Sequence, residues 1–206
     1  MSREQSSVTS GQTAARQAPP RMPPYGVIQF ASFYQGNEDL WQFMLRTHVN
    51  LCESRVATPV SEAWGWGDRK PFEAAMAAAR VQVEASHKVG VKAMAYVGYH
   101  PIYGDAAKRT GIFEFYDQRW NQYEDYLGPR PPDPIEWAMR DAAGKPMPFS
   151  FREWHGYYIC MNNPYWLQFL NGCLHLLVDS GVDGVRYDGP GGGLCWCKFC
   201  RDAFAR

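Results

Sequence analysis

The chain has 206 residues, of which 46% are hydrophobic and 20% charged, and its 21 Lys and Arg balance its 21 Asp and Glu. This is the composition of a globular protein with enough apolar residues for a sizeable core, not that of a disordered chain. There is no basic excess to neutralise phosphates, and no run of the ~20 apolar residues that span a bilayer, so we expect neither nucleic acid nor membrane as a partner.

Residues 1–24 are rich in Ser, Gln, Arg and Pro. They contain no apolar stretch like that of a secretory signal, and too few apolar groups to offset the entropy of ordering them. We therefore predict a disordered leader over residues 1–24, followed by one domain over residues 25–206. The missing signal sequence favours a cytoplasmic protein.

Strand and helix patterns alternate through the domain. Runs of β-branched and aromatic residues predict strands over residues 26–33, 48–53, 91–99 and 184–188. Helix start signals are found at Asn37, Pro71 and Asn163, and we expect a last helix to begin near Lys198. Residues 101–163 show no clean period, but they hold 13 of the 31 aromatic residues (8 Trp, 12 Tyr and 11 Phe in all). That is too many for disorder, so we predict an ordered, aromatic-rich insertion after the third strand.

This alternation predicts a parallel sheet with helical crossovers, as in doubly wound sheets and in eight-stranded barrels. A dinucleotide-binding fold is disfavoured because the first strand leads into Tyr34-Gln35-Gly36-Asn37, without the G-x-G-x-x-G turn. The glycines at 189–193 lack the Lys and Ser/Thr of a phosphate-binding loop. We therefore predict an α/β fold, the N-terminal half of a (β/α)8 TIM barrel, with about four of its β/α units. Its two open sheet edges predict self-association into a homo-oligomer, or poor solubility.

The fourth predicted strand ends in Val185-Arg186-Tyr187-Asp188. Side chains alternate along a strand, so Arg186 and Asp188 share one face, while the apolar pair suits the face covered by helices. The charged pair then faces the barrel lumen at the strand end where active sites of this fold gather. The arginine keeps the carboxylate of Asp188 ionised, which suits a glycosidase nucleophile better than a general acid. The alternative is an Arg–Asp pair that only organises the barrel mouth.

Three of the six cysteines, Cys195, Cys197 and Cys200, lie within six residues. This C-x-C-x-x-C motif brings three thiolates within reach of one metal ion, and zinc requires a fourth ligand to complete its tetrahedron. The alternatives are free thiols, a disulfide such as Cys195–Cys200, or an iron–sulfur cluster. Cys52 and Cys173 lie on apolar faces of a predicted strand and helix, and we expect them in the core.

The chain resembles the barrel proteins called hypothetical glycosyl hydrolase family 6, which are described as α-amylase-like or as carrying a β-galactosidase trimerisation domain. The segments that carry the resemblance are Asn162-Asn163-Pro164-Tyr165-Trp166, the run from Gly181 to Pro190 and the run from Cys195 to Phe204. The Gly-Val-Arg-Tyr-Asp run is also similar to the α-amylase strand whose final Asp is the nucleophile. The resemblance covers most of residues 25–206. It implies an O-glycoside hydrolase with a carbohydrate substrate, in which Asp188 is the nucleophile and Arg186 supports it.

The cysteine motif is similar to one that follows the fourth strand of family 42 β-galactosidases. In that family the motif binds structural zinc together with a fourth cysteine from the region after the third strand. The resemblance therefore implies a structural zinc ion held by Cys160, Cys195, Cys197 and Cys200. Family 42 enzymes end their fourth strand in Asn-Glu, whereas this chain ends it in Arg-Tyr-Asp, so their acid/base assignment does not transfer.

Five residues near the predicted strand ends are candidates for substrate binding: Glu53, Trp64, Trp66, Tyr99 and His100. Aromatic faces suit the apolar surfaces of sugars, but aromatic residues that hold a loop together and an ordinary loop histidine are the structural alternatives. The glycosidase hypothesis competes with a non-catalytic carbohydrate-binding or scaffold barrel and with an inactive truncated product. The sequence does not identify the second catalytic carboxylate. We expect it on strands outside this chain, and we expect no turnover by the chain alone.

Overall fold

The computed structural model describes residues 30–31, 50–53, 59–98, 101–188 and 193–205. Phe30, Ala31, Glu53 and Asp188 are described by their backbone alone. The predicted leader over residues 1–24 and the predicted helix that begins at Asn37 lie outside these residues, so both remain predictions.

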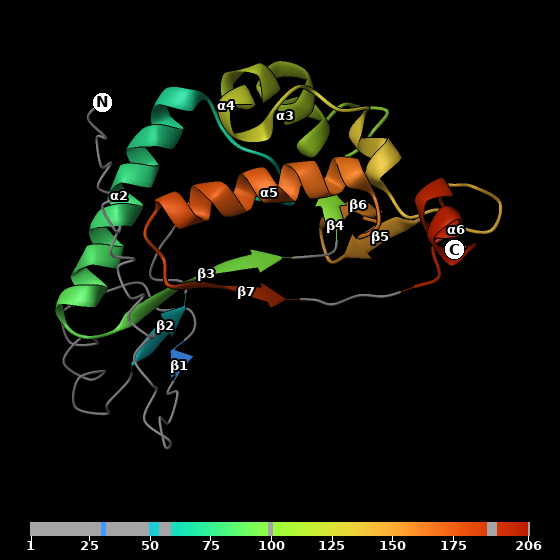
Figure 1. Ribbon diagram of the computed structural model, residues 1–206. Coiled ribbons are helices and arrows are strands. Elements are labelled where there is room, and N and C mark those ends of the chain that lie inside the picture. The colour runs from blue at the N-terminus through green and yellow to red at the C-terminus, as the bar shows by residue number, and fades with distance from the viewer. Residues whose placement is uncertain (1–29, 32–49, 54–58, 99–100, 189–192, 206) are drawn as a thin grey trace, which may run out of the picture.

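Four parallel strands form the main sheet (Figure 1). They are β1 (Phe30–Ala31), β2 (Leu51–Glu53), β3 (Lys92–Gly98) and β7 (Gly184–Asp188), which lie side by side in that order. The prediction of four parallel strands in chain order is thereby confirmed. The strands lie in the sheet in the same order as in the chain, whereas in a doubly wound sheet the strand order reverses at one point. The sheet is open, and β1 and β7 are its outer strands within the described residues, so a half barrel is not established.

One face of the sheet is covered by the helices α2 (Arg69–Lys88) and α5 (Pro164–Asp179), as Figure 1 shows. Alternate residues of β3 are buried on this face and pack with apolar residues of the two helices: Ala93, Ala95 and Val97. Tyr96, on the other face, is 42% exposed. Among the described residues, both helices that pack on the main sheet lie on the same face, which is the arrangement of a barrel, whereas a doubly wound sheet carries helices on both faces.

Helix α5 begins where the sequence predicts, after Asn163. This side chain is fully buried, and its oxygen accepts a hydrogen bond from the backbone N–H of Tyr165 at 2.9 Å. The bond satisfies one of the free N–H groups of the first helical turn. The side-chain amide of Asn163 donates to the backbone carbonyl of Glu136 at 2.7 Å. Asn163 therefore joins the start of α5 to the insertion.

The insertion after β3 is ordered, as predicted, and contains elements that the sequence pattern does not reveal. The strands β4 (Pro101–Tyr103), β5 (Pro148–Phe151) and β6 (Trp154–Tyr158) form an antiparallel sheet in the order β4-β6-β5. Between β4 and β5 lie the helices α3 (Ile112–Gln118), η1 (Trp120–Tyr123), α4 (Glu124–Leu127) and η2 (Pro134–Trp137). Trp120 and Trp137 are fully buried against Phe169 of α5, and these rings hold the insertion on α5.

The C-terminal ends of the main strands, the insertion and the last helix lie on one side of the molecule. Figure 1 shows the arrowheads of β3 and β7 pointing toward the small sheet and toward α6 (Lys198–Phe204). Among the described helices, none combines the length and the apolar character needed to cross a membrane. In parallel α/β folds this side of the sheet carries the functional groups.

Candidate metal centre

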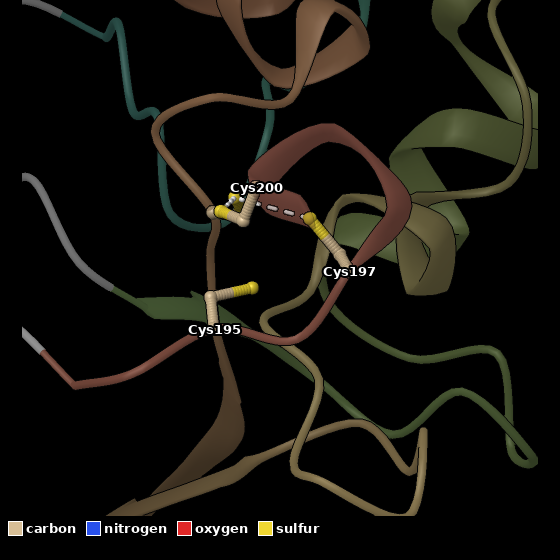
Figure 2. A group of neighbouring side chains, drawn as sticks. Cys195, Cys197 and Cys200 are labelled. Carbon is tan, nitrogen blue, oxygen red and sulfur yellow. Dashed lines mark hydrogen bonds between the residues drawn. The ribbon is translucent and has the colours of Figure 1, made fainter. Parts of the chain in front are cut away.

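Four cysteines from two distant parts of the chain gather beside the insertion. The sulfur atoms of Cys160, Cys195, Cys197 and Cys200 all lie within 4.8 Å of one another. The Sγ of Cys160 is 3.5 Å from that of Cys197 and 3.3 Å from that of Cys200. Figure 2 shows Cys195, Cys197 and Cys200 with their sulfur atoms turned toward one another. The four cysteines predicted as a ligand set are therefore neighbours, and we call them the four-cysteine cluster.

Cys160 is fixed by backbone hydrogen bonds on both sides. Its N–H donates to the carbonyl of Trp137 at 3.0 Å, and its carbonyl accepts from the N–H of Asn163 at 3.0 Å. The preceding residue, Ile159, forms a β-bridge with Ala138. The sulfur of Cys160 therefore projects from the point where β6, η2 and the start of α5 meet.

The other three cysteines belong to the segment after β7. The N–H of Trp196 donates to the carbonyl of Arg140 at 2.8 Å, which attaches this segment to the insertion. Cys197 is the N-cap residue of α6, and Cys200 lies in the first turn of that helix. Residues three apart in a helix lie on one face, so both sulfurs are presented to Cys160 from the same side.

Two sulfurs of the cluster accept hydrogen bonds from N–H groups. The backbone N–H of Arg140 donates to the Sγ of Cys195 at 3.4 Å, and the side-chain amide of Asn162 donates to the Sγ of Cys200 at 3.3 Å. Hydrogen bonds of this kind orient the ligands of a metal ion and favour the ionised form of the sulfur. The sulfurs of Cys195 and Cys200 therefore have the N–H donors that stabilise thiolate ligands.

Burial opposes ionisation of the cluster when no cation is present. Cys160 and Cys197 are 2% and 8% exposed, and burial raises the pKa of both thiols above its ordinary value. Burial also tends to raise the pKa of Cys195. Its sulfur accepts hydrogen bonds, however, chiefly from the backbone N–H groups of Cys197 and Arg140, and these outweigh burial and lower its pKa. A bound metal ion supplies the positive charge that several buried thiolates require.

None of the six cysteines is in a disulfide, so the alternative of a Cys195–Cys200 disulfide does not hold. Cys52 and Cys173 are fully buried, and Cys173 packs in the main core between the sheet and α5. The prediction that these two cysteines are core residues is therefore confirmed.

A second group of functional candidates lies on β3 and β7, on the face opposite the described helices α2 and α5. Arg186 pairs in register with Tyr96, and its guanidinium carbon lies 5.9 Å from the centre of the Tyr96 ring. Val185 packs against the core on the covered face, as predicted, whereas Tyr187, predicted for the same face, is 43% exposed. Asp188 ends β7 opposite Gly98. The side chain of Asp188 lies outside the described residues, so its role remains a prediction.

Trp64 has the exposure that a sugar-binding aromatic residue needs. Its side chain is 44% exposed, and its ring centre lies 4.8 Å from that of Tyr103. Together with Phe149 and His155, Trp64 lines a groove of 610 Å³ between the small sheet and the segment that precedes α2. The groove has both ring surfaces and polar groups along its walls.

Trp66, two residues further along the chain, belongs to the core. Its side chain is 3% exposed and contacts the rings of Phe72 and Phe169. No face of this ring is left for a substrate, so the assignment of Trp66 to substrate binding is corrected to a packing role. Tyr99 and His100, and the side chain of Glu53, lie outside the described residues.

Glu62, which no sequence motif marks, places a buried carboxyl group at the tip of β3. It is 7% exposed, and its Oε1 lies 2.9 Å from the position that a Cβ on Gly98 would occupy. Burial raises the pKa of Glu62 to about 7, although backbone N–H groups of Glu62 and Gly98 act in the opposite direction. The burial depends on how the loop folds over β3, and a single glutamate in a loop gives no sign of it.

No protein-family model matches the chain, and no curated protein matches it. Among solved structures, the chain is similar to a noncanonic maltogenic α-amylase, AmyB, from Thermotoga neapolitana, at 12% sequence identity and a TM-score of 0.40. The match covers 76% of this chain and 35% of that protein, so the chain spans about a third of its length.

Proposed function

We propose that the chain binds one zinc ion through the four-cysteine cluster and that this ion stabilises the fold. Zinc bound by four thiolates at ~2.3 Å sets the sulfurs at the corners of a tetrahedron, roughly 3.8 Å apart. The observation that carries the proposal is that all four sulfurs lie within 4.8 Å of one another. Shifts of roughly 1 Å or less bring them to the tetrahedral spacing.

Four protein thiolates fill the coordination tetrahedron, which is the pattern of a structural zinc site rather than a catalytic one. The compact set also favours a single ion over an iron–sulfur cluster. In a cluster the four thiolates are divided among two or four iron ions, so the sulfurs of the protein lie further apart than around one ion. The ion would fasten the start of α5, through Cys160, to the segment after β7, through Cys197 and its neighbours.

Metal analysis of the purified chain tests this proposal. We expect about one zinc ion per chain in the wild type, because four thiolates form a closed site. Cys173→Ala, which removes a core cysteine outside the cluster, keeps the ion. Cys197→Ser loses most of it. Zinc that persists in Cys197→Ser, or a wild-type chain that takes up no metal when zinc is supplied, contradicts the proposal.

We further propose that the chain forms the N-terminal half of a (β/α)8 barrel of a glycoside hydrolase. Three observations support this second function. The strands run parallel in chain order, α2 and α5 cover the same face, and Arg186 lies on the opposite face, which is the lumen in a barrel. The exposed ring of Trp64 beside the groove favours a carbohydrate ligand, because aromatic faces pack on the apolar faces of sugar rings.

In this proposal Asp188 is the nucleophile and Arg186 supports it. Asp188 is the last residue of β7, at the strand end where the catalytic groups of barrel enzymes lie. The alternation along β7 predicts that its side chain shares the face of Arg186, whose positive charge favours the ionised carboxylate.

Binding of an iminosugar tests the glycosidase proposal without requiring turnover. Protonated iminosugars carry the charge of the oxocarbenium-like transition state and bind to the carboxylates that stabilise it. We expect calorimetry to show binding to the wild-type chain and at least about tenfold weaker binding to Asp188→Asn, a loss of about 1.4 kcal/mol or more. Carbohydrate binding that is unchanged in Asp188→Asn would identify a non-catalytic binding module instead.

A further inference from the structure

Five aromatic rings form a continuous strip along the small sheet of the insertion. The ring centre of Tyr103 lies 4.8 Å from that of Trp64. It lies 5.7 Å from the ring centre of Phe149 and 5.6 Å from that of Trp154. The ring of Phe151 extends the strip beyond Trp154, with the two centres 6.2 Å apart. We call these five residues the aromatic strip.

The strand register places four of these rings on one face of the small sheet. Tyr103 of β4 and Phe149 of β5 are both paired with Gly156, which lies between them on β6. Paired residues of antiparallel strands share a face, and Gly156 has no side chain, so the two rings meet over it. Trp154, two residues before Gly156, and its partner Phe151 lie on the same face.

Trp64 joins the strip from the segment that precedes α2. The N–H of Tyr103 donates to the carbonyl of Ala63 at 2.8 Å, which places Trp64 beside β4. Trp64, Trp154 and Phe151 are 44%, 43% and 51% exposed. Because these rings contact one another in a chain and remain exposed, they form the kind of contiguous apolar surface that marks a binding site.

The groove of 610 Å³ adjoins the aromatic strip, because Trp64 and Phe149 line both. Its volume lies in the range of ~300–1,000 Å³ that is usual for ligand pockets. Ser150 and His155 also line it, and the Oγ of Ser150 lies 3.0 Å from the Nδ1 of His155. A hydroxyl and an imidazole can both donate and accept hydrogen bonds, as the hydroxyl groups of a sugar require.

The charged residues of the groove favour an uncharged ligand. Among the described residues that line it, Asp105 and Glu153 carry carboxylates and Lys108 carries an ammonium group. The ammonium group of Lys108 lies 3.9 Å from the carboxylate of Asp105. An anionic ligand would meet two negative groups for one positive group, whereas sugar hydroxyls donate to carboxylates and accept from ammonium groups.

The rings of the strip are tilted against one another. The ring planes of Trp64 and Tyr103 differ by 38°, and those of Tyr103 and Trp154 differ by 51°. Rings with these tilts cannot all lie flat on the surface of a crystalline polysaccharide. They can each contact one sugar unit of a single chain whose units turn relative to one another.

We propose that the aromatic strip and the groove bind a single chain of neutral sugar units, so that the ligand is a soluble oligosaccharide or polysaccharide rather than a small glycoside. The inference rests on the carbohydrate ligand of the proposed function, and it does not require Asp188 to be the nucleophile. The exposed rings contact the apolar faces of successive sugar units, and the polar groups of the groove bind their hydroxyls.

Calorimetric titration with neutral oligosaccharides of increasing length tests this inference. The probes are the disaccharides and hexasaccharides of the gluco-, manno-, galacto- and xylo-oligosaccharide series. We expect at least one series to bind, with the hexasaccharide tighter than the disaccharide because the longer chain reaches more rings. In Trp154→Ala the hexasaccharide should bind at least about tenfold more weakly. The disaccharide should bind this variant as well as the wild type, because Trp154 is not among the described residues that line the groove.

Two further variants separate loss of the ring from damage to the fold. Trp154→Phe keeps an aromatic ring and should retain most of the affinity for the hexasaccharide. Phe204→Ala removes a ring that is 95% exposed on α6, outside the strip, and should leave the affinity unchanged.

The inference is overturned if no oligosaccharide of the panel binds the wild type, or if Trp154→Ala binds the hexasaccharide as tightly as the wild type does. It is also overturned if Trp154→Ala abolishes self-association of the chain while sugar binding is absent, because the strip is then an interface between copies. Iminosugar binding that depends on Asp188 would leave the glycosidase proposal standing in these cases. Length-dependent binding without any effect of Asp188→Asn supports the strip and contradicts the nucleophile.

Discussion

Cys197→Ser is expected to lower the free energy of unfolding by at least about 3 kcal/mol, because the binding free energy of a structural zinc ion contributes directly to folding. The ion would join the segment after β7 to the insertion and to the start of α5, which already meet through the ring pair of Tyr165 and Phe199. The N–H of Trp196 donates to the carbonyl of Arg140, and Phe199 packs in the same small apolar cluster as Met139 of the insertion. Thermal unfolding followed by circular dichroism, with and without a strong chelator, measures the effect.

The chelator separates loss of the ion from ordinary packing damage. Cys173→Ala costs stability through a cavity in the core, but it keeps the ion, so the chelator lowers its unfolding temperature as much as that of the wild type. Cys197→Ser already lacks the ion, so the chelator has little further effect on it. A wild-type chain whose unfolding is insensitive to the chelator rules out a stabilising metal.

Glu62→Gln is expected to stabilise the chain at alkaline pH by about 3 kcal/mol, the free energy of a pKa difference of about 2.5 units. Burial raises the pKa of Glu62 from 4.5 to about 7, so the folded chain holds this proton more tightly than the unfolded chain. The stabilisation from this proton is fully present below pH ~4.5 and is lost as pH rises through about 7. Glutamine cannot ionise, so the variant escapes this loss.

Denaturant unfolding at several pH values measures this effect. The advantage of Glu62→Gln over the wild type should grow between pH 5 and 8, because only the wild type must bury a charge. The matched control is Glu73→Gln on α2, whose carboxylate is 60% exposed and pairs with Arg69. It should change stability little at any of these pH values. A Glu62→Gln variant that is no more stable than the wild type at pH 8 would show that the Glu62 carboxylate is well solvated or paired.

Sequence patterns predict the regular elements of this chain because those elements follow local rules. The fourth strand of the main sheet, Gly184–Asp188, has the predicted bounds, and α5 and α6 begin where the capping residue and the pattern indicate. The insertion follows no local period because the strands β4, β5 and β6 are only three to five residues long. They are stabilised by cross-strand partners up to about 57 residues away, such as Tyr158 for Pro101.

At the candidate sites, too, the sequence reveals what local spacing determines and does not reveal what depends on how distant segments pack. Dense cysteine spacing marks Cys195, Cys197 and Cys200, and only the resemblance to another family selects Cys160 as their partner. Trp64 and Trp66 look alike in sequence, yet one is 44% exposed and the other 3%. The difference arises because the rings of the insertion enclose Trp66.

X-ray absorption spectroscopy at the zinc edge measures directly whether the four cysteines hold one metal ion. For the chain as purified, we predict a single zinc ion with four sulfur neighbours at about 2.3 Å and no nitrogen or oxygen ligand. In Cys197→Ser, any zinc that remains should have at most three sulfur neighbours. A wild-type spectrum dominated by nitrogen or oxygen ligands would contradict the four-cysteine site.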